Sequence, residues 1–334
     1  MVIKYYGNLK LIYILFLIIW FSHTENMIAQ DPVFSQFMFN QVYFNPSFAG
    51  TNPSPRFAAG FRNQWPGLGD TYISYYASYD QFIEKISGGI GVSVNKDYQG
   101  NGVFSSTGFN LMYSYPVTIN SGLIINMGLQ AGIYQNLLNT SGLIFTDPSQ
   151  LISSGTNENI PGQSNFYPDF SAGISFYANE QYQISIAVNH LNTPKIVPGY
   201  SSAYTLPISL KLQILSQFPG KPDNKEKYNF IFYPGFMAQI QNEYIYLNYG
   251  SNIQFKQILS GLWLRNDLLF HLNTFIFMAG WAWSGIHLTY SYDLWLPKTY
   301  QPSLIYNSNE VTIVYLFKYK ESKKKMRAIN CPKF

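Results

Sequence analysis

The most constraining feature of this chain is a two-residue alternation across residues 122–134, which read GLIINMGLQAGIY. The odd positions are all apolar, whereas the even positions are mostly small or polar. Successive side chains of a β-strand point to opposite faces, so the pattern predicts a strand between an apolar and a polar environment. Strands of soluble proteins usually have about 5 to 6 residues, whereas about 9 to 11 tilted residues cross a bilayer. The segment therefore predicts a transmembrane β-strand with its odd side chains toward lipid.

The same alternation recurs along the chain and predicts about 14 strands in total. Segment 261–265 shows it weakly, and segment 270–281 is apolar on both faces. The segments besides 122–134 are 56–65, 72–80, 89–95, 109–115, 169–176, 182–189, 204–213, 228–241, 243–254, 261–265, 270–281, 286–293 and 311–317. So many strands predict an all-β fold, a transmembrane antiparallel β-barrel over residues 56–319, because closure leaves no unpaired edge.

Composition agrees with a barrel in a membrane. Charged residues make up 11% of the chain, against about 25% in soluble domains, while aromatic residues reach 18%. Few charges and many aromatics are typical of a barrel that is apolar outside and belted by aromatic side chains. The longest connections, 135–165, 191–203 and 294–309, all fall on one side if the N-terminus is periplasmic, so that side is expected to face outward. Connection 218–227 is longer than a periplasmic turn should be.

The two ends of the chain differ from the barrel region. Residues 1–29 carry lysines before an apolar core at 11–21, which predicts a signal peptide. The alternative, an uncleaved anchor, fits less well because this core is short for a spanning helix. Residues 30–55 mix aromatics with prolines and asparagines, and we expect this lead-in either to plug the lumen or to lie beneath the barrel. Residues 320–334 form a basic tail, expected in the periplasm.

Several charged residues occupy positions predicted to face the lumen: Arg56, Arg62, Asp80, Asp169, Lys211, Arg265 and Asp293. An Arg or Lys facing lipid would cost about 2 to 4 kcal/mol at the bilayer midplane, so an inward orientation is expected. Two interpretations remain open for these side chains. They form either a structural network of salt bridges and hydrogen bonds, or the lining of a path for a solute or polypeptide.

The sequence offers little support for catalysis or for cofactor binding. It contains no HExxH, GxSxG or glycine-rich phosphate loop, and its single cysteine excludes an intrachain disulfide. We therefore predict no enzymatic activity, no cofactor and no metal. The net charge of +4 is too small to indicate a nucleic-acid partner.

The lead-in also carries the clearest family signal. It contains QDPVFSQ at residues 30–36, MFN at 38–40 and NPSFAG at 45–50, followed by RNQW at 62–65. These motifs, together with CPKF at residues 331–334, resemble the PorP/SprF family of outer-membrane proteins linked to type IX secretion. The resemblance covers essentially the whole mature chain.

The resemblance implies a non-enzymatic barrel in the outer membrane, reached after removal of the signal peptide. Members of the family are associated with export or surface retention of large adhesins and, in some bacteria, with gliding motility. The implied partners are outer-membrane lipid, a secreted type IX substrate and other secretion-system proteins. The alternative function is an outer-membrane channel for small solutes. The family pattern transfers no catalytic residues to this chain.

Overall fold

The computed structural model describes residues 31–68, 72–139, 163–179, 181–196, 205–220, 230–268, 271–296 and 307–318. The predicted signal peptide, Gln30 and the basic tail lie outside these residues, as do large parts of the longest connections. Within the described ranges, no helix is long and apolar enough to cross a membrane.

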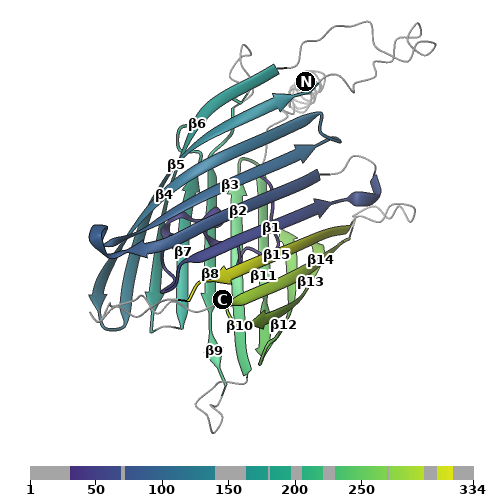
Figure 1. Ribbon diagram of the computed structural model, residues 1–334. Coiled ribbons are helices and arrows are strands. Elements are labelled where there is room, and N and C mark those ends of the chain that lie inside the picture. The colour runs from purple at the N-terminus through teal and green to yellow at the C-terminus, as the bar shows by residue number, and fades with distance from the viewer. Residues whose placement is uncertain are drawn as a thin grey trace, which may run out of the picture.

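The described strands form one closed antiparallel β-barrel, in which each strand pairs with its neighbours in sequence (Figure 1). The ring closes where β1 pairs with β15. Because β8 and β9 both pair with β10, they are two parts of one interrupted strand, and the barrel has 14 strands as predicted. The bounds are β1 Arg56–Gln64, β2 Tyr72–Ile83, β3 Gly88–Gln99, β4 Phe104–Asn120, β5 Leu123–Leu138, β6 Gln163–Ala178, β7 Tyr182–Asn189, β8 Ser209–Ser216, β9 Phe218–Pro219, β10 Phe230–Gln241, β11 Tyr244–Phe255, β12 Ile258–Asp267, β13 Leu272–Trp283, β14 Ile286–Trp295 and β15 Asn307–Leu316.

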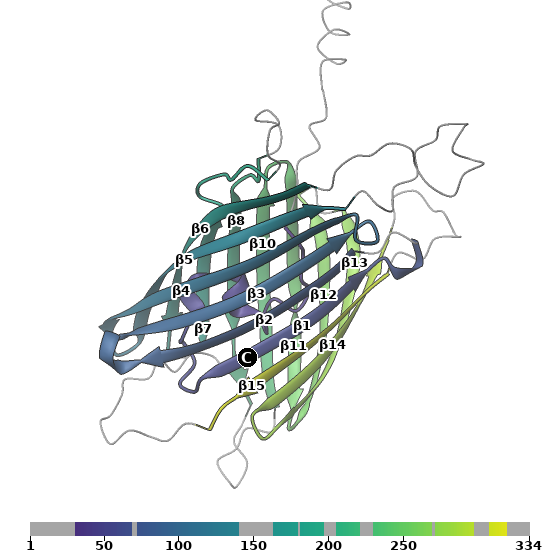
Figure 2. The same cartoon turned by 45° about the horizontal axis from the view of Figure 1, so that its top comes forward.

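The two ends of the barrel differ in their connections (Figure 2). We call the end where β5 joins β6, through residues 139–162, the loop end. The opposite end, here the turn end, has connections of only two residues at 121–122, 256–257 and 284–285, although it also has the longer connection 220–229, and the loop end has one two-residue connection at 242–243. β1 starts at the turn end and β15 finishes there, as an even number of strands requires.

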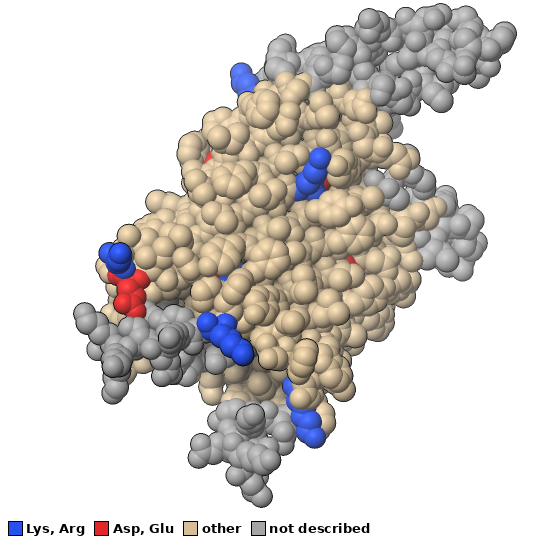
Figure 3. All heavy atoms as spheres, in the orientation of Figure 1, with Lys and Arg blue, Asp and Glu red and all other residues tan. Residues whose placement is uncertain are grey.

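Side chains alternate as the sequence predicts. On β5, Leu129 and Ile133 are exposed on the outer face, whereas Asn126 and Gln130 are buried toward the lumen. Figure 3 shows that most of the visible outer face carries neither acidic nor basic side chains. The outer face is therefore suited to contact with lipid.

The eighth predicted strand, 204–213, is wrong at its start. β8 begins only at Ser209, because Pro207 has no N–H for a ladder and Thr205 instead forms an isolated bridge with Lys195. Leu206 consequently packs with Tyr167 in a buried cluster rather than facing lipid as the alternation implied.

The two-residue alternation is weak in the strands predicted at 261–265 and 270–281, and the structure shows the cause. β12 and β13 carry large apolar side chains on their inner face as well, including Trp263, Ile276 and Met278, all of which are buried. These side chains contact the chain segment that precedes the barrel. An apolar inner face obscures the period-2 pattern, because both faces then read as hydrophobic.

Residues 31–55, which we call the luminal segment, lie inside the ring of strands. The segment contains the short helix α2 (Gln41–Phe44) and the 3-10 turn η1 (Pro46–Phe48). It is hydrogen-bonded to strands as far apart around the ring as β5, β7 and β15. The hydrophobic core of the protein is thus the interface between this segment and the inner wall.

Candidate functional site

The luminal segment runs the length of the lumen, from the loop end to the turn end. Asp31 contacts His190 and Gln241, which lie where β7 and β10 finish at the loop end. Gly50 donates a backbone hydrogen bond to Asp80 on β2, close to the turn end. The chain then leaves the lumen and enters β1 at Arg56.

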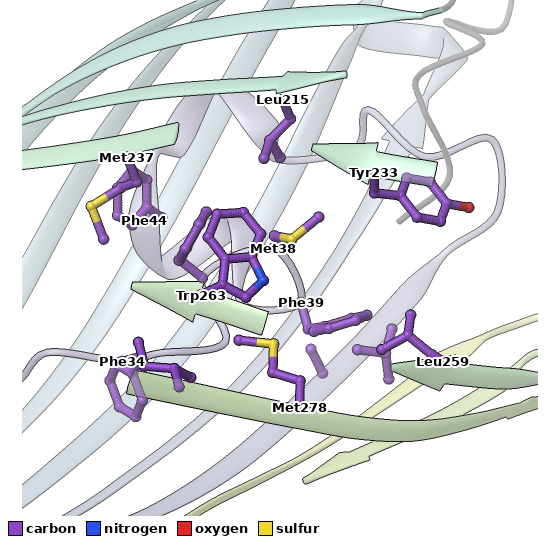
Figure 4. Packing of buried hydrophobic residues seen from close by; sticks show 14 of the residues in the cluster. Phe34, Met38, Phe39, Phe44, Leu215, Tyr233, Met237, Leu259, Trp263 and Met278 are labelled. Atoms are coloured by element: carbon purple, nitrogen blue, oxygen red, sulfur yellow. The ribbon is translucent and has the colours of Figure 1, made fainter. Parts of the chain in front are cut away.

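One part of the segment contacts the wall through apolar side chains (Figure 4). Phe37 is 2% exposed and meets Trp263 edge to face, with ring centroids 5.1 Å apart. Met38 and Phe44 lie in the same cluster, against wall residues such as Met237. Without the segment, these wall residues would face a polar lumen. The apolar contact therefore makes the segment an integral part of the folded barrel.

The NPSFAG motif approaches the opposite wall so closely that glycine is required there. A Cβ on Gly128 would lie 2.3 Å from the backbone nitrogen of Ser47, and one on Gly173 would lie 1.9 Å from Oδ1 of Asn45. Asn45 in turn donates to the backbone oxygen of Ile186 at 3.1 Å. The small residues on the inner faces of β5 and β6 thus make room for the turn η1.

The first group of luminal charges, which we call the lower pair, joins Arg56 to Asp80. Nε of Arg56 lies 2.9 Å from Oδ1 of Asp80, and both side chains are almost fully buried. Arg56 also donates to the side chain of Gln41 and to the backbone oxygen of Phe48. The lower pair therefore connects β1 and β2 to the luminal segment.

The second group, the arginine cluster, contains Arg62, Arg265, Asp293 and Glu310. Arg62 lies 2.8 Å from Asp293 and 3.1 Å from Glu310, and Arg265 lies 3.7 Å from Asp293. The hydroxyl of Ser35 accepts from both arginines and donates to Asp293 at 2.6 Å, while its backbone N–H donates to Glu310 at 2.7 Å. This cluster therefore surrounds the luminal segment at Ser35.

The third group, the Asp31 cluster, contains Asp31, Asp169, His190 and Lys211. Nε2 of His190 lies 2.9 Å from Asp31, its Nδ1 lies 3.0 Å from Asp169, and Lys211 Nζ lies 3.9 Å from Asp31. Burial opposes the charge of Asp31, but His190 and Lys211 outweigh it and lower the pKa of Asp31 to about 2. Burial likewise opposes the His190 cation, but Asp31 and Asp169 raise the pKa of His190 to about 9. At neutral pH His190 is therefore a cation paired with the carboxylate of Asp31.

All seven charged residues singled out from the sequence fall in these three groups. Arg56 and Asp80 form the lower pair; Arg62, Arg265 and Asp293 belong to the arginine cluster; Asp169 and Lys211 belong to the Asp31 cluster. Each group also contacts the luminal segment, so these side chains anchor it.

Sequence reasoning missed three members of these groups: Asp31, His190 and Glu310. Glu310 precedes the predicted strand 311–317, although it continues the inward-facing series of Ser308 and Thr312 on β15. That alternation was a readable signal. Asp31 and His190 lie outside any strand, so no periodicity marked them.

A small cavity remains beside the Asp31 cluster. It has a volume of about 90 Å³ and lies toward the loop end, between the luminal segment and β3 to β8. Its wall mixes polar side chains, including Asp97, Asn110, Gln130 and Asn189, with apolar and aromatic ones, and the rings of Tyr134 and Tyr167 stack there with centroids 5.7 Å apart. Across the described part of the chain, no group of three or more His, Cys, Asp or Glu side chains could hold a metal ion.

Sequence comparison gives one clear match. The family described as type IX secretion system membrane protein PorP/SprF matches residues 26–315. No curated protein matches the chain.

Several solved outer-membrane barrels are similar in structure. The Pseudomonas putida toluene transporter TodX is 11% identical, with 83% of this chain and 93% of that chain covered and a TM-score of 0.47. A Pseudomonas aeruginosa FadL homologue is 11% identical, with coverages of 81% and 94% and a TM-score of 0.44. Omp33 of Acinetobacter baumannii is 5% identical, with coverages of 80% and 100% and a TM-score of 0.43.

Proposed function

Because this chain belongs to the PorP/SprF family of type IX secretion system membrane proteins, we propose that it is a plugged accessory barrel of the outer membrane. In this role it assists export or cell-surface anchoring of a secreted, adhesin-like protein. The observation that supports the proposal is the filled lumen. An apolar contact and three charged groups hold the luminal segment, so a polypeptide would have to engage the outside of the barrel rather than pass through it.

The shape of the barrel favours engagement at the loop end. β4, β5 and β6 have 17, 16 and 16 residues, whereas β1 has 9 and β7 has 8. At about 3.3 Å per residue and a tilt of about 40°, a strand as long as β5 rises about 40 Å along the barrel axis. The apolar band of such a barrel is only about 25 Å tall. Lys96, Thr107 and Gln135, which are paired across β3 to β5, interrupt the apolar outer face near the loop end. We propose that the strand ends beyond this row stand outside the bilayer, where the exposed side chains of Phe166 and Leu137 would be open to a partner.

The expected partners divide between the two sides of the membrane. The secreted substrate would bind at the loop end, outside the cell, and lipid would cover the apolar outer face. Other secretion-system proteins would bind the turn end and the basic tail at residues 320–334. The signal peptide, residues 1–29, would be removed before assembly. The luminal segment is buried, so we do not assign it a periplasmic partner.

We propose a non-enzymatic role, since no constellation among the described residues suggests a reaction. The lower pair, the arginine cluster and the Asp31 cluster hold the luminal segment, and the buried Asp97 accepts hydrogen bonds from Ser74 and Gln99 on the wall. This part of the proposal would be contradicted if the purified protein hydrolysed lipid or protein and a single substitution abolished that activity.

Deletion of the gene tests the proposed role directly. The amount of adhesin on the cell surface should fall, with a matching increase in the medium or inside the cell. Restoring the wild-type gene should restore the surface fraction. A type IX substrate that does not depend on this barrel would serve as the control for the secretion system as a whole. Unchanged adhesin secretion and retention in the deletion strain would reject the role.

The second candidate function is a channel for small solutes, favoured by the cavity of about 90 Å³ near the loop end, which several polar side chains line. Planar bilayers separate the two functions. A plugged accessory barrel should show no stable conductance when the purified protein is inserted, whereas steady single-channel openings would favour the channel.

A further inference from the structure

Asp31 occupies a site built from side chains of the barrel wall. His190 Nε2 lies 2.9 and 3.0 Å from its two carboxylate oxygens, and the backbone N–H of Asp31 donates to Oε1 of Gln241 at 3.0 Å. Asp169 holds the other ring nitrogen of His190 at 3.0 Å. The wall thus presents an oriented, buried cation to a carboxylate that comes from outside the barrel strands.

Lys211 is incompletely satisfied in this arrangement. It is 2% exposed, and its closest carboxylate oxygen among the described residues belongs to Asp31, at 3.9 Å. That separation is too long for a hydrogen bond. The ammonium otherwise faces the rings of Tyr43 and Phe44, at 5.3 and 5.4 Å from their centroids. A buried ammonium without a short hydrogen bond is costly, so a better-placed carboxylate would be stabilised here.

The charge of the cluster restricts what can replace Asp31. Two cations, His190 and Lys211, face two anions, Asp31 and Asp169. Asp97 also lines the neighbouring cavity, but it accepts hydrogen bonds from Ser74 and Gln99. Exchanging Asp31 for another carboxylate conserves the charge, whereas a neutral or cationic group leaves one buried cation unpaired.

The position of the site makes such an exchange physically accessible. Asp31 lies at the loop end and precedes Phe37 in the luminal segment, so its release does not require the apolar contact around Phe37 to break. The cavity of about 90 Å³ adjoins both Asp31 and Lys211 and provides room for an incoming group.

We propose that His190, Lys211 and Gln241 form a carboxylate-binding site at the loop end, which Asp31 fills in the free protein. A carboxylate of the secreted polypeptide, from an acidic side chain or from its C-terminus, takes the place of Asp31. That the ligand is a secreted polypeptide rests on the proposed secretion role. The ability of the site to bind a carboxylate does not depend on that role.

Three peptide probes test the site on the purified full chain in detergent micelles. The first is an end-blocked pentapeptide with one internal aspartate. The second has asparagine instead and a free C-terminal carboxylate, and the third is the asparagine peptide with both ends blocked. Fluorescence polarisation of the labelled peptides measures their affinity. A preference for the first or for the second peptide identifies the source of the carboxylate.

The Asp31→Asn variant, which removes the carboxylate from the site while keeping the side-chain shape, should bind at least one carboxylate peptide about tenfold more tightly than the uncharged peptide. Wild-type protein and Asp31→Glu should show little preference, because their own carboxylate competes. Adding Lys211→Gln to Asp31→Asn should abolish the preference. Asp31→Ala provides a second vacated site, and the urea midpoint checks that each variant is folded.

Asp97→Asn is the matched control, because it removes a negative charge from the same cavity without vacating the Asp31 position. If Asp97→Asn and Asp31→Asn increased the affinity for carboxylate peptides equally, the loss of any negative charge would explain the effect. That result would overturn the proposal. Equal affinity of folded Asp31→Asn and Asp31→Ala for all three peptides would also overturn it. Neither result would alter adhesin retention in the deletion strain, so the site and the proposed secretion role can fail separately.

Discussion

Arg56 and Asp80 illustrate how single residues hold the luminal segment. The pair is almost fully buried and also binds Gln41 and the backbone of Gly50. Removing one member leaves the other charge buried and unpaired. Removing both leaves only neutral groups without partners, which is less costly.

Substitution of Asp80 by alanine should therefore lower the free energy of unfolding by about 3–5 kcal/mol. The double variant Arg56→Met/Asp80→Leu should lose less than this, because no unpaired charge remains. Urea unfolding in lipid vesicles measures both values. Losses that simply add from Arg56→Met and Asp80→Leu would show that the two charges are not coupled.

His190 introduces a pH dependence. Its pKa is raised to about 9 from an ordinary value of 6.5, because Asp31 and Asp169 favour the cation despite burial. Its stabilising contribution is fully present below about pH 6.5 and is lost as the pH rises through about 9. The pKa of Asp31 is lowered from 3.8 to about 2, so its own stabilising contribution is fully present above about pH 3.8. That contribution is lost as the pH falls through about 2.

The difference in urea midpoint between wild type and His190→Gln should consequently be largest near pH 6 and shrink as the pH approaches 9 and above. His271→Gln is the control, since His271 is an exposed histidine that also contacts an aspartate, Asp267, at 3.0 Å. A pH profile for His190→Gln that matches the control would contradict the ion-pair assignment.

At the scale of elements, β5 tests the two faces of the wall. Ile125 and Asn126 are adjacent, and the alternation alone predicts that Asn126→Arg is tolerated while Ile125→Arg is not. The structure removes that contrast, because Asn126 is 1% exposed and donates to the backbone oxygen of Ser47. An arginine there would collide with the luminal segment.

Leu129 and Gln130 provide a better pair. Leu129 is 65% exposed on the outer face, whereas Gln130 lines the cavity. Leu129→Arg should cost about 2–4 kcal/mol near the bilayer midplane, and Gln130→Arg considerably less. Heat-modifiable mobility in gels, after refolding into vesicles, reports the assembled fraction. Equal assembly of the two variants would contradict the assigned faces.

The contact between η1 and β5 depends on the absence of a side chain at Gly128. Gly128→Ala should destabilise the protein by about 1–3 kcal/mol, because its Cβ would meet the backbone of Ser47. Gly173→Ala meets the side chain of Asn45, whose displacement would break its hydrogen bond to Ile186 but would move no backbone, so its effect should be smaller. Urea midpoints give the order of the two variants, and the reverse order would argue against backbone contact at Gly128.

At the scale of the whole molecule, the luminal segment converts a barrel into a closed body. Its apolar side chains cover Trp263, Met237 and other inner-wall residues that would be unfavourable in water. The segment and the wall therefore stabilise each other, and the apolar inner faces of β12 and β13 are explained only by their mutual contact.

Deletion of residues 31–52 should lower the urea midpoint and produce ion conductance in planar bilayers, since the lumen loses its filling. Adding a synthetic peptide of the same sequence should reduce that conductance if the wall retains its shape. A deletion variant that is as stable as wild type and electrically silent would show that the segment does not seal the lumen.

The barrel, its strand number and the faces of most strands could be predicted from the sequence alone. The reason is local: a membrane outside and a polar interior impose a two-residue pattern that each strand carries alone. The prediction was wrong where this rule was broken, at Pro207, whereas the strand at β13 was predicted although its alternation is weak.

The place of the lead-in and the pairing of the charges, in contrast, could be seen only in the folded chain. Arg62 on β1 reaches Glu310 because closure places β15 beside β1, 248 positions apart in the chain. Likewise, Asp31 meets His190 only because the segment runs the length of the lumen. Such contacts depend on ring closure and on the path of one irregular segment, and neither leaves a periodic trace in the sequence.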